Sequence, residues 1–489
     1  MDTIANYPEV LAVIVGLPLV GIVAKFFGVS FERIAKWYLY IAVFAVVVVM
    51  NSIFFPFIGG KDYFFRFAVE LALIFFMLWW AVEARNGEVE SLVKTSFKNP
   101  LFIAVSAFVV MVLLACLFAY DMNAAFWSNY ERGESGFQMI HYYIFFALLV
   151  LLMRTEKDWK NLFKSSLVAA GLMIVYGLFG NFGVNGFIGS YAGSQAPNGI
   201  WHKLIDGRFQ GSLGNPAYVA PYLIFSMFYA GYLWVRRQAS TRMNTWANIG
   251  YGAMIAVFLL FFILSQTRGA FLGLGVGVFV LVLYLIFSAR AKVRKWSLVA
   301  LGVLIVLAGT GYTFRNSSFV QNLPEGRLLQ LSLSDATAQS RFWTWNSAWQ
   351  GFLERPVLGW GPENFTAVFD KYFDVRHFAP GVPTETWFDR AHSVFFDYLA
   401  ETGVLGLLSY LSIFIIFFWE FFSRRHAAAE GGSKEVFARG LILALPIAYL
   451  VQGVAIFDVF PMYINLFLFA AFAYYYFYER QHQHHGQHS

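Results

Sequence analysis

Three arginines and one histidine stand where this mostly apolar chain passes from a polar segment into an apolar run. Arg268 lies in 263-ILSQTRGAFLGLGVG-277, where a very short turn joins two long apolar runs. A guanidinium at the N-terminus of a helix suits a bound phosphate, because the arginine fork and the terminal N–H groups both favour an anion. The alternative is an arginine that extends to lipid headgroups. Arg268 is therefore a candidate for anion binding.

Arg208 opens a second such segment, 208-RFQGSLGNPAYVAPYL-223. Its glycines, Asn215 and Pro216 predict a turn that leads directly into a helix, with proline near the first helical position. A solvated loop arginine is the alternative, so Arg208 is the less certain member of the set.

Arg341 lies in 334-SDATAQSRFWTWNSAWQGFLERPVLGWGPENF-365, which predicts an amphipathic helix near 335–354. Ser334 or Asp335 is expected to cap this helix, and Pro356 to end it. At helical spacing one face carries Arg341, Trp345, Ala348, Trp349 and Phe352. Two compatible interpretations remain open: a helix on the membrane surface with interfacial tryptophans, or a lid that points Arg341 into a site.

His392 belongs to 390-RAHSVFFDYLAETGVLGLLSYL-411, and we expect it in the first turn of a membrane helix. Asp397 and Glu401 are one turn apart on a common face, whereas His392 points about 140° away from Asp397. We expect His392 to face a cavity at the outer interface, with a structural interfacial histidine as the alternative. Asp397 and Glu401 are expected to hold other polar groups inside the helix bundle.

The composition shows what must position these residues. Of 489 residues, 59% are hydrophobic and only 13% are charged, which indicates a membrane protein with many spans. The net charge of +6 comes from lysines and arginines in short loops, so no nucleic-acid partner is expected. A single cysteine, Cys116, excludes disulfides and thiolate metal clusters within the chain.

Apolar runs long enough to cross about 30 Å of hydrocarbon recur along the chain, and only helices fit their length and uniform apolar character. We place thirteen runs: 9–27, 35–56, 64–82, 100–119, 137–153, 163–181, 216–235, 247–265, 269–288, 296–314, 393–421, 438–457 and 461–478. The predicted fold class is an all-α polytopic membrane protein with about 12–13 transmembrane helices.

Every second loop is basic, which predicts an external N-terminus and a cytoplasmic C-terminus. The outer face then carries the polar segments 120–136, 182–215 and 315–391. The last is too long for a connector and too aromatic to be disordered. The predicted organisation is therefore 1–314, about ten transmembrane helices; 315–391, a large external loop; 392–480, about three further transmembrane helices; and 481–489, a His-rich disordered tail.

Other ionisable residues near the predicted membrane boundary have simpler interpretations. Asp62 and Asp458 lie in outer turns, and we expect both to be solvated. Glu70 follows Arg66 by four residues, a spacing that favours an ion pair along one helix.

Taken together, five segments resemble the O-antigen ligase/polymerase superfamily. Each motif alone is weak, but they occur in the order of the family, with the large external loop where the family has it. The segments are 208-RFQGSLGNP-216, 265-SQTRGA-270, 340-SRFWTWNSAW-349, 355-RPVLGWGPENF-365 and 392-HSVFFDYLAETGVLG-406.

This resemblance implies a GT-C-like membrane glycosyltransferase in the bacterial cytoplasmic (inner) membrane, with its site on the periplasmic face. The expected reaction transfers a glycan from an undecaprenyl-diphosphate carrier to an acceptor. O-antigen ligation to lipid A–core is expected first, with polysaccharide polymerase or protein O-oligosaccharyltransferase as alternatives. A lipid-linked sugar transporter or flippase is the more distant alternative; the polar candidates concentrate on one side, which disfavours it.

By motif, the essential arginines and histidine of the family correspond to Arg268, Arg341 and His392, with Arg208 as a further diphosphate ligand. Trp345 joins the arginines as a predicted contact for the donor glycan. Arginines stabilise the charge that grows on a leaving diphosphate without a metal, and a histidine suits the base that the acceptor hydroxyl needs. The outer loops contain no D-x-D pair, so we expect an inverting reaction with no metal and no cofactor.

Overall fold

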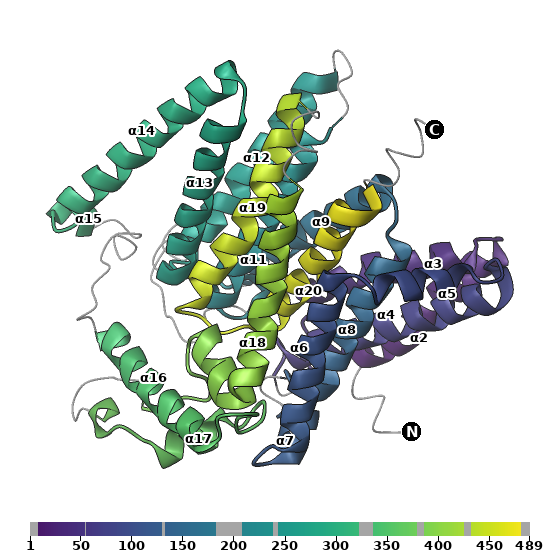
Figure 1. Cartoon of the computed structure of the whole chain (residues 1–489), viewed down its shortest axis with the longest axis horizontal. Helices are drawn as coiled ribbons and strands as arrows, with labels where there is room; N and C mark the ends of the chain where they lie inside the picture. The colour runs from purple at the N-terminus through teal and green to yellow at the C-terminus, as the bar shows by residue number, and fades with distance from the viewer. Residues whose placement is uncertain are drawn as a thin grey trace. The chain divides into compact units, whose positions relative to one another are not determined.

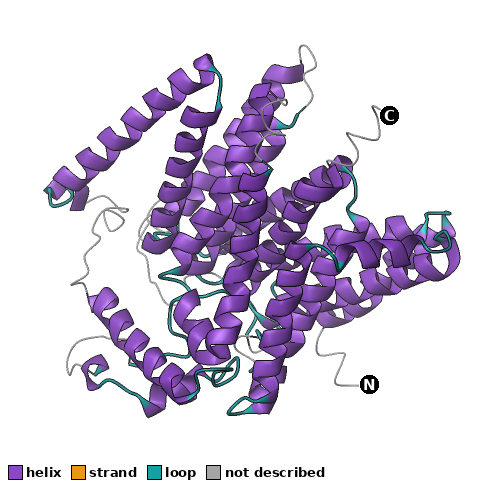
Figure 2. Ribbon diagram, viewed as in Figure 1, coloured by secondary structure: helices purple, strands orange, loops and turns teal. Residues whose placement is uncertain are grey.

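The computed structural model describes residues 8–53, 55–129, 133–181, 208–237, 243–321, 336–378, 386–424 and 432–480. Throughout these residues the regular structure is helical (Figure 1; Figure 2). The predicted caps Ser334 and Asp335 and the tail 481–489 lie outside them. The chain folds as two compact units that alternate along the sequence. The first takes the described residues of 1–169, 342–420 and 458–489, and the second those of 170–341 and 421–457.

Up to residue 181, the helices are α2 (Pro8–Phe26), α3 (Phe31–Ala42), η1 (Val43–Val47), α4 (Gly59–Leu78), η2 (Trp79–Glu83), α5 (Glu88–Ser96), α6 (Pro100–Leu117), α7 (Met122–Trp127), α8 (Gly136–Leu152) and α9 (Glu156–Asn181). The following helices are η3 (Gly211–Leu213), α11 (Pro216–Val235), α12 (Met243–Leu264), α13 (Arg268–Ser288), α14 (Ala291–Phe314) and α15 (Ser318–Gln321). The remaining helices are α16 (Ala336–Glu354), α17 (Phe365–Lys371), η5 (Val375–His377), α18 (Val394–Ser423), α19 (Gly432–Gly453), α20 (Phe460–Tyr474) and η7 (Tyr475–Glu479).

Eleven of the described helices are long and apolar enough to cross a membrane, and α8 is a shorter apolar helix. The all-α polytopic fold is therefore confirmed. The predicted run 35–56 is the exception, because it holds the short helix α3, the 3₁₀ turn η1 and a turn that returns Met50 N–H to the carbonyl of Pro56 at 3.1 Å. Four consecutive valines before that turn and the proline after them disfavour a continuous helix.

Within the first unit, the basic loops predicted for one face contact one another. Lys25 in the last turn of α2 pairs with Glu83 after α4 at 2.7 Å, and Arg154 after α8 pairs with Glu88 at 3.3 Å and with Glu32 at 3.4 Å. Three loops distant in sequence thus meet at one end of the unit, as alternating spans require.

The predicted outer segments of the first unit meet in the same way. Glu134, before α8, accepts a hydrogen bond from the backbone N–H of Phe460 at the start of α20, at 2.7 Å. Tyr120 N–H donates to the carbonyl of Trp360 at 2.8 Å. Loops from three parts of the chain therefore form one layer.

Three expectations about charged residues in this unit were wrong. Asp62 is buried in the first turn of α4, where its carboxylate lies against Gly133 of the loop before α8. Asp458 is also buried rather than solvated. Glu70 contacts His141 on α8 at 2.9 Å and not Arg66, which donates to Gln138 instead. Helix packing across the bundle outweighs the pairing along one helix.

In the second unit, a stripe of glycines brings α13 and α19 into close contact, as their spacing of four predicts. A Cβ at Gly273 would lie 2.6 Å from the backbone oxygen of Ala448, and one at Gly277 would lie 2.8 Å from the Ala448 Cβ. A Cβ at Gly269 would lie 3.2 Å from the Ala455 Cβ. Any larger side chain at the first two positions must push the helices apart.

A matched pair of variants tests this contact. Gly273→Leu is expected to lower the free energy of unfolding by about 1–3 kcal/mol, because it overpacks a close helix interface. Gly275→Leu, on the same helix with open space around its Cβ, is the control and should leave stability close to wild type. Thermal unfolding of the purified protein in detergent measures both, and equal midpoints for the two variants would refute the packing role.

Candidate functional site

Residues 355–361, part of the predicted external loop, dock onto a break in α18 by backbone hydrogen bonds. Gly403 interrupts the helix with φ 63° and ψ −168°. Beside it, Trp360 N–H donates to the carbonyl of Ala400 at 2.9 Å, and Gly361 N–H to that of Glu401 at 2.8 Å. Backbone N–H groups of the G-W-G-P motif therefore take the place of the helical N–H groups that would bond these carbonyls if α18 were continuous.

Glycine is required on both sides of this contact. Gly359 has φ 67°, and a Cβ there would lie 2.4 Å from the Glu401 carbonyl carbon. A Cβ at Gly403 would lie 2.4 Å from the Val357 carbonyl carbon. Two left-handed glycines thus let the segment and the helix approach within backbone contact, which gives the E-T-G and L-G-W-G motifs a shared structural purpose.

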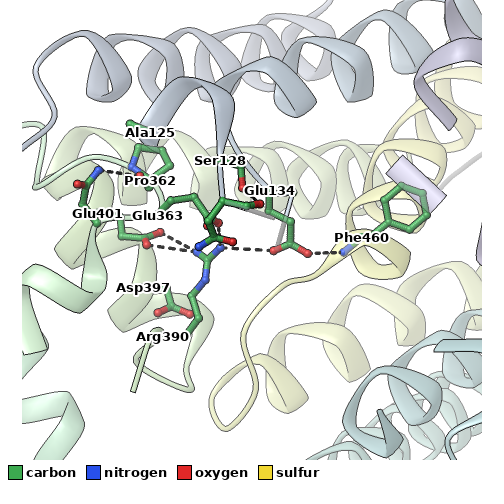
Figure 3. Close-up of polar contacts among 12 residues, drawn as sticks. Ala125, Ser128, Glu134, Pro362, Glu363, Arg390, Asp397, Glu401 and Phe460 are labelled. Carbon is green, nitrogen blue, oxygen red and sulfur yellow. Dashed lines mark hydrogen bonds and ion pairs between the residues drawn. The ribbon is translucent and has the colours of Figure 1, made fainter. Parts of the chain in front are cut away.

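Arg390, just before α18, is the centre of a buried ion cluster (Figure 3). Its guanidinium donates to both carboxylate oxygens of Glu401, at 3.2 and 3.0 Å, and also to Glu363. Glu134 lies 3.5 Å away and bridges onward to Phe460. Four segments far apart in the sequence are joined through this one side chain.

The cluster is enclosed. Side-chain exposure is 6% for Arg390 and 5% or less for its three partners Glu134, Glu363 and Glu401. Burial disfavours the charged guanidinium, but the surrounding carboxylates outweigh it and raise the pKa of Arg390 well above its ordinary value. A cavity of about 20 Å³ beside Arg390 and Glu401 has room for a water molecule and not for a sugar. The cluster is therefore a structural support and not a pocket for a glycan.

Asp397 ties the chain just before α18 back onto the helix. Its Oδ1 accepts a hydrogen bond from Ala391 N–H at 2.6 Å, while its own N–H donates to the Ser393 carbonyl at 2.8 Å. Two side chains of α18 thus hold the residues before it: Glu401 binds Arg390, and Asp397 binds Ala391. This confirms that the two acids hold other polar groups inside the bundle, and it identifies those groups.

His392 follows directly after these two anchored residues. It was expected in the first turn of the helix, but α18 begins at Val394, and His392 has a left-handed backbone with φ 56°. That conformation is uncommon for a residue with a side chain and persists only where its surroundings impose it. The tethers on Arg390 and Ala391 supply that constraint.

The imidazole of His392 is half-buried and has a defined orientation. Its edge meets the Phe388 ring at a centroid distance of 5.2 Å, and Nδ1 lies 3.2 Å from the Arg390 carbonyl. A carbonyl oxygen only accepts, so Nδ1 carries the proton in the neutral ring and Nε2 holds the lone pair. His392 Nε2 is therefore the atom able to take a proton.

Helix α16 ends at Glu354 as predicted, but its packed face differs from the prediction. Small residues, not aromatic ones, form that face: Thr344, Ser347, Ala348 and Gly351 are buried, and Trp349 is 44% exposed. A Cβ at Gly351 would lie 2.3 Å from a Val368 methyl group on α17. The close approach of α17 selects small side chains, which the helical periodicity of apolar residues did not reveal.

Trp345 lies at the edge of this packed face and stacks on Phe396 of α18, with ring centroids 5.1 Å apart and planes 16° apart. Its indole nitrogen is buried and has no hydrogen-bond partner among the described residues. Trp345 thus lies against the first turn of the helix that follows His392. Arg341 is half-buried one turn earlier on α16.

In the second unit, the structure brings Arg208 to the turn that precedes Arg268. Arg208 donates to the Ser265 carbonyl at 3.1 Å and to the Thr267 hydroxyl at 3.2 Å. Thr267 also bonds the Pro216 carbonyl at 3.1 Å. Helix α13 begins at Arg268, one residue before the predicted run, and α11 begins at Pro216 after the expected turn. Two helix N-termini and two arginines therefore share one end of this unit.

The charge of the second unit favours an anion at that end. Glu435 is the one carboxylate among the residues of this unit that the structure describes, and it pairs with Arg236 at the opposite end of α11. Helix N-termini add partial positive charge to that of the arginines.

Sequence reasoning did not identify Arg390, Glu363 and Glu134 as a cluster. Arg390 and Glu401 are eleven residues apart, and the two other glutamates come from loops with no periodic relation to α18. The available signal was local: glutamate within G-P-E-N and arginine two residues before the histidine are charges in otherwise apolar surroundings.

Residues 253–411 match the family model described as O-Antigen ligase. The matched range contains Arg268, Arg341, Trp345 and His392, whereas Arg208 lies before it. A comparison with curated proteins finds no match. Over these residues the family match confirms the resemblance to the O-antigen ligase/polymerase superfamily that the motifs predicted.

The ion cluster yields a stability prediction. Glu401→Gln is expected to lower the free energy of unfolding by about 1–3 kcal/mol, because an amide cannot accept from Arg390 through both of its terminal atoms and one buried hydrogen bond is lost. Glu354→Gln, in the exposed pair with Lys371 at 2.7 Å, is the control and should change stability little. Denaturation in detergent measures both. A Glu401→Gln protein as stable as wild type would show that the cluster does not hold the outer layer together.

Proposed function

We propose that this O-antigen ligase superfamily member transfers a glycan from an undecaprenyl-diphosphate donor to a hydroxyl acceptor on the periplasmic face of the inner membrane. The observation that carries the proposal is His392, held in a left-handed backbone with its Nδ1 directed at the Arg390 carbonyl. Such a constraint serves a residue whose orientation matters for chemistry. Incubating the purified protein with a lipid-diphosphate-linked glycan and candidate acceptors, and identifying the product by mass, tests it.

In this mechanism the arginines bind the donor diphosphate. Arg268 at the first position of α13 and Arg208 beside its N-cap, Thr267, offer fixed positive charge together with helix N–H groups. Arg341 on α16 is the third proposed ligand. As the bond from the anomeric carbon to the diphosphate oxygen breaks, these charges stabilise the leaving diphosphate, and no metal is required for that task.

His392 is the proposed general base. Its Nε2 takes the proton from the acceptor hydroxyl as that oxygen attacks the anomeric carbon on the face opposite the diphosphate, which inverts the configuration. The proton already on Nδ1 stays bonded to the Arg390 carbonyl, so the imidazolium that forms keeps its orientation. Trp345, whose ring is held by stacking on Phe396, is the proposed aromatic contact of the donor glycan.

We assign O-antigen ligation to lipid A–core as the first candidate reaction and polysaccharide polymerisation as the second, since the matched family description favours the ligase. A single glycan addition to lipid A–core identifies a ligase, and a ladder of repeats identifies a polymerase. Transport of the donor without any glycan product would contradict both.

The base assignment predicts a large loss of turnover. His392→Gln is expected to slow transfer about 10²–10⁴-fold, the range for removal of a general base, with donor binding retained. His377→Gln is the control, because His377 is buried among the rings of Phe369, Phe373 and Phe388 in the same external segment. Rates are normalised to folded protein. Near-wild-type transfer by His392→Gln would exclude this histidine as the base.

The diphosphate assignment predicts that arginine geometry matters as well as charge. Arg268→Lys is expected to lower transfer by on the order of 10²-fold, because an ammonium replaces the planar fork. Arg315→Lys is the control: Arg315 donates to the Tyr312 carbonyl at 2.6 Å and covers that ring. If both lysine variants had equal activity, Arg268 would be no diphosphate ligand.

The metal-independent mechanism predicts that turnover is unchanged after dialysis against EDTA. Arginines, rather than a divalent ion, neutralise the leaving diphosphate in this account. Loss of transfer with EDTA, and its recovery when a divalent ion is added back, would overturn that part of the proposal.

A further inference from the structure

The second unit contains a large apolar cavity at the end opposite Arg268. The cavity has a volume of about 740 Å³ and lies between α11, α12, α13, α14 and α19 (Figure 1). Its walls are apolar side chains, among them Met227, Phe228, Leu259, Leu274, Val278 and Leu281. A smaller cavity of about 400 Å³ shares Leu281, Val293 and Phe437 with it and adds Lys292 and Trp296. The two cavities are therefore neighbours beside α13.

The rim of the larger cavity is polar and positively charged. Arg237 donates to the Asn248 side chain at 2.8 Å, and Trp234 donates to the same oxygen at 2.9 Å. Lys434 donates to the Arg237 carbonyl at 3.0 Å. The two cationic side chains are therefore held at the same edge, next to a tryptophan of the kind found at membrane interfaces.

Among the residues of this unit that the structure describes, basic side chains outnumber acidic ones at this edge. Glu435 brings one negative charge against the positive charges of Arg236, Arg237 and Lys434, and it pairs with Arg236 at 2.8 Å. A net positive rim above an apolar cavity complements an amphiphile with an anionic head.

The rim is also far from the arginines that we assign to the donor. Helix α11 separates Pro216, next to Thr267, from Arg237, and 20 residues of helix span about 30 Å, the thickness of the hydrocarbon core. A lipid bound here has its head at the opposite surface from the donor diphosphate.

From this arrangement we infer that the second unit binds an anionic phospholipid of the leaflet that faces the basic loops. The phosphate of the headgroup contacts Arg237 and Lys434, and an acyl chain occupies the cavity beneath them. Basic pockets between membrane helices at the cytoplasmic surface are suited to such lipids, whereas zwitterionic lipids gain less from the two cations.

Native mass spectrometry of the full chain, with phosphatidylglycerol and phosphatidylcholine of identical acyl chains, tests the inference. Wild-type protein is expected to bind phosphatidylglycerol more tightly. The double variant Arg237→Gln/Lys434→Gln should lose about 30-fold in affinity for it, as expected for two basic groups at about 1 kcal/mol each. Arg294→Gln/Lys295→Gln removes two exposed charges of α14 that do not line either cavity, and it should retain wild-type affinity.

A third variant separates the contribution of the acyl chain to lipid binding from that of the headgroup. Leu274→Trp places a bulky ring in the cavity and leaves the rim charges in place, so it should weaken both lipids alike. Equal binding of the two lipids by wild-type protein, or equal loss in the two double variants, would overturn the inference. A polyprenyl phosphate that displaces phosphatidylglycerol at lower concentration would also overturn it, because the cavity would then belong to the donor lipid. These readouts measure lipid binding and stand whether or not glycan transfer is confirmed.

Discussion

The buried charge of Arg390 is the constraint on which the outer layer of the first unit depends. A guanidinium excluded from water must be surrounded by carboxylates, and here Glu134, Glu363 and Glu401 arrive from three different segments. Because the three glutamates belong to different segments, the ion cluster ties together the loop before α8, the predicted external loop and α18. His392, two residues after Arg390, takes its position from that arrangement.

The same arrangement explains why two short motifs of weak individual meaning occur together. Gly359 and Gly403 allow backbone contact between the external segment and the broken helix α18. Glu363 and Glu401 then reach Arg390 from the two sides of that contact. Substitutions at these positions should affect the geometry around His392 although none of them needs to touch a substrate.

Much of the fold was predictable because apolar length and loop charge are direct physical requirements of a bilayer. The starts of α11 and α13, the end of α16 and the glycine contact at Gly273 all followed from local pattern. What failed depended on contacts between distant segments. Periodicity could not show that α17 selects small residues on α16, that Asp62 lies against the loop before α8, or that Arg390 gathers glutamates from separate segments. A charged residue in an apolar stretch can be identified as important from the sequence, but the sequence does not show which residue pairs with it.

The central claim is that the charges around Arg390 and Asp397 act on the reaction by holding His392 in place. A double-mutant cycle with Asp397→Asn and His392→Gln tests it most directly, with transfer rates measured per folded molecule. If Asp397 acts through His392, the double variant is no slower than His392→Gln alone, although Asp397→Asn by itself is slow. If the two losses multiply in the double variant, Asp397 acts independently of the histidine, and the positioning account is contradicted.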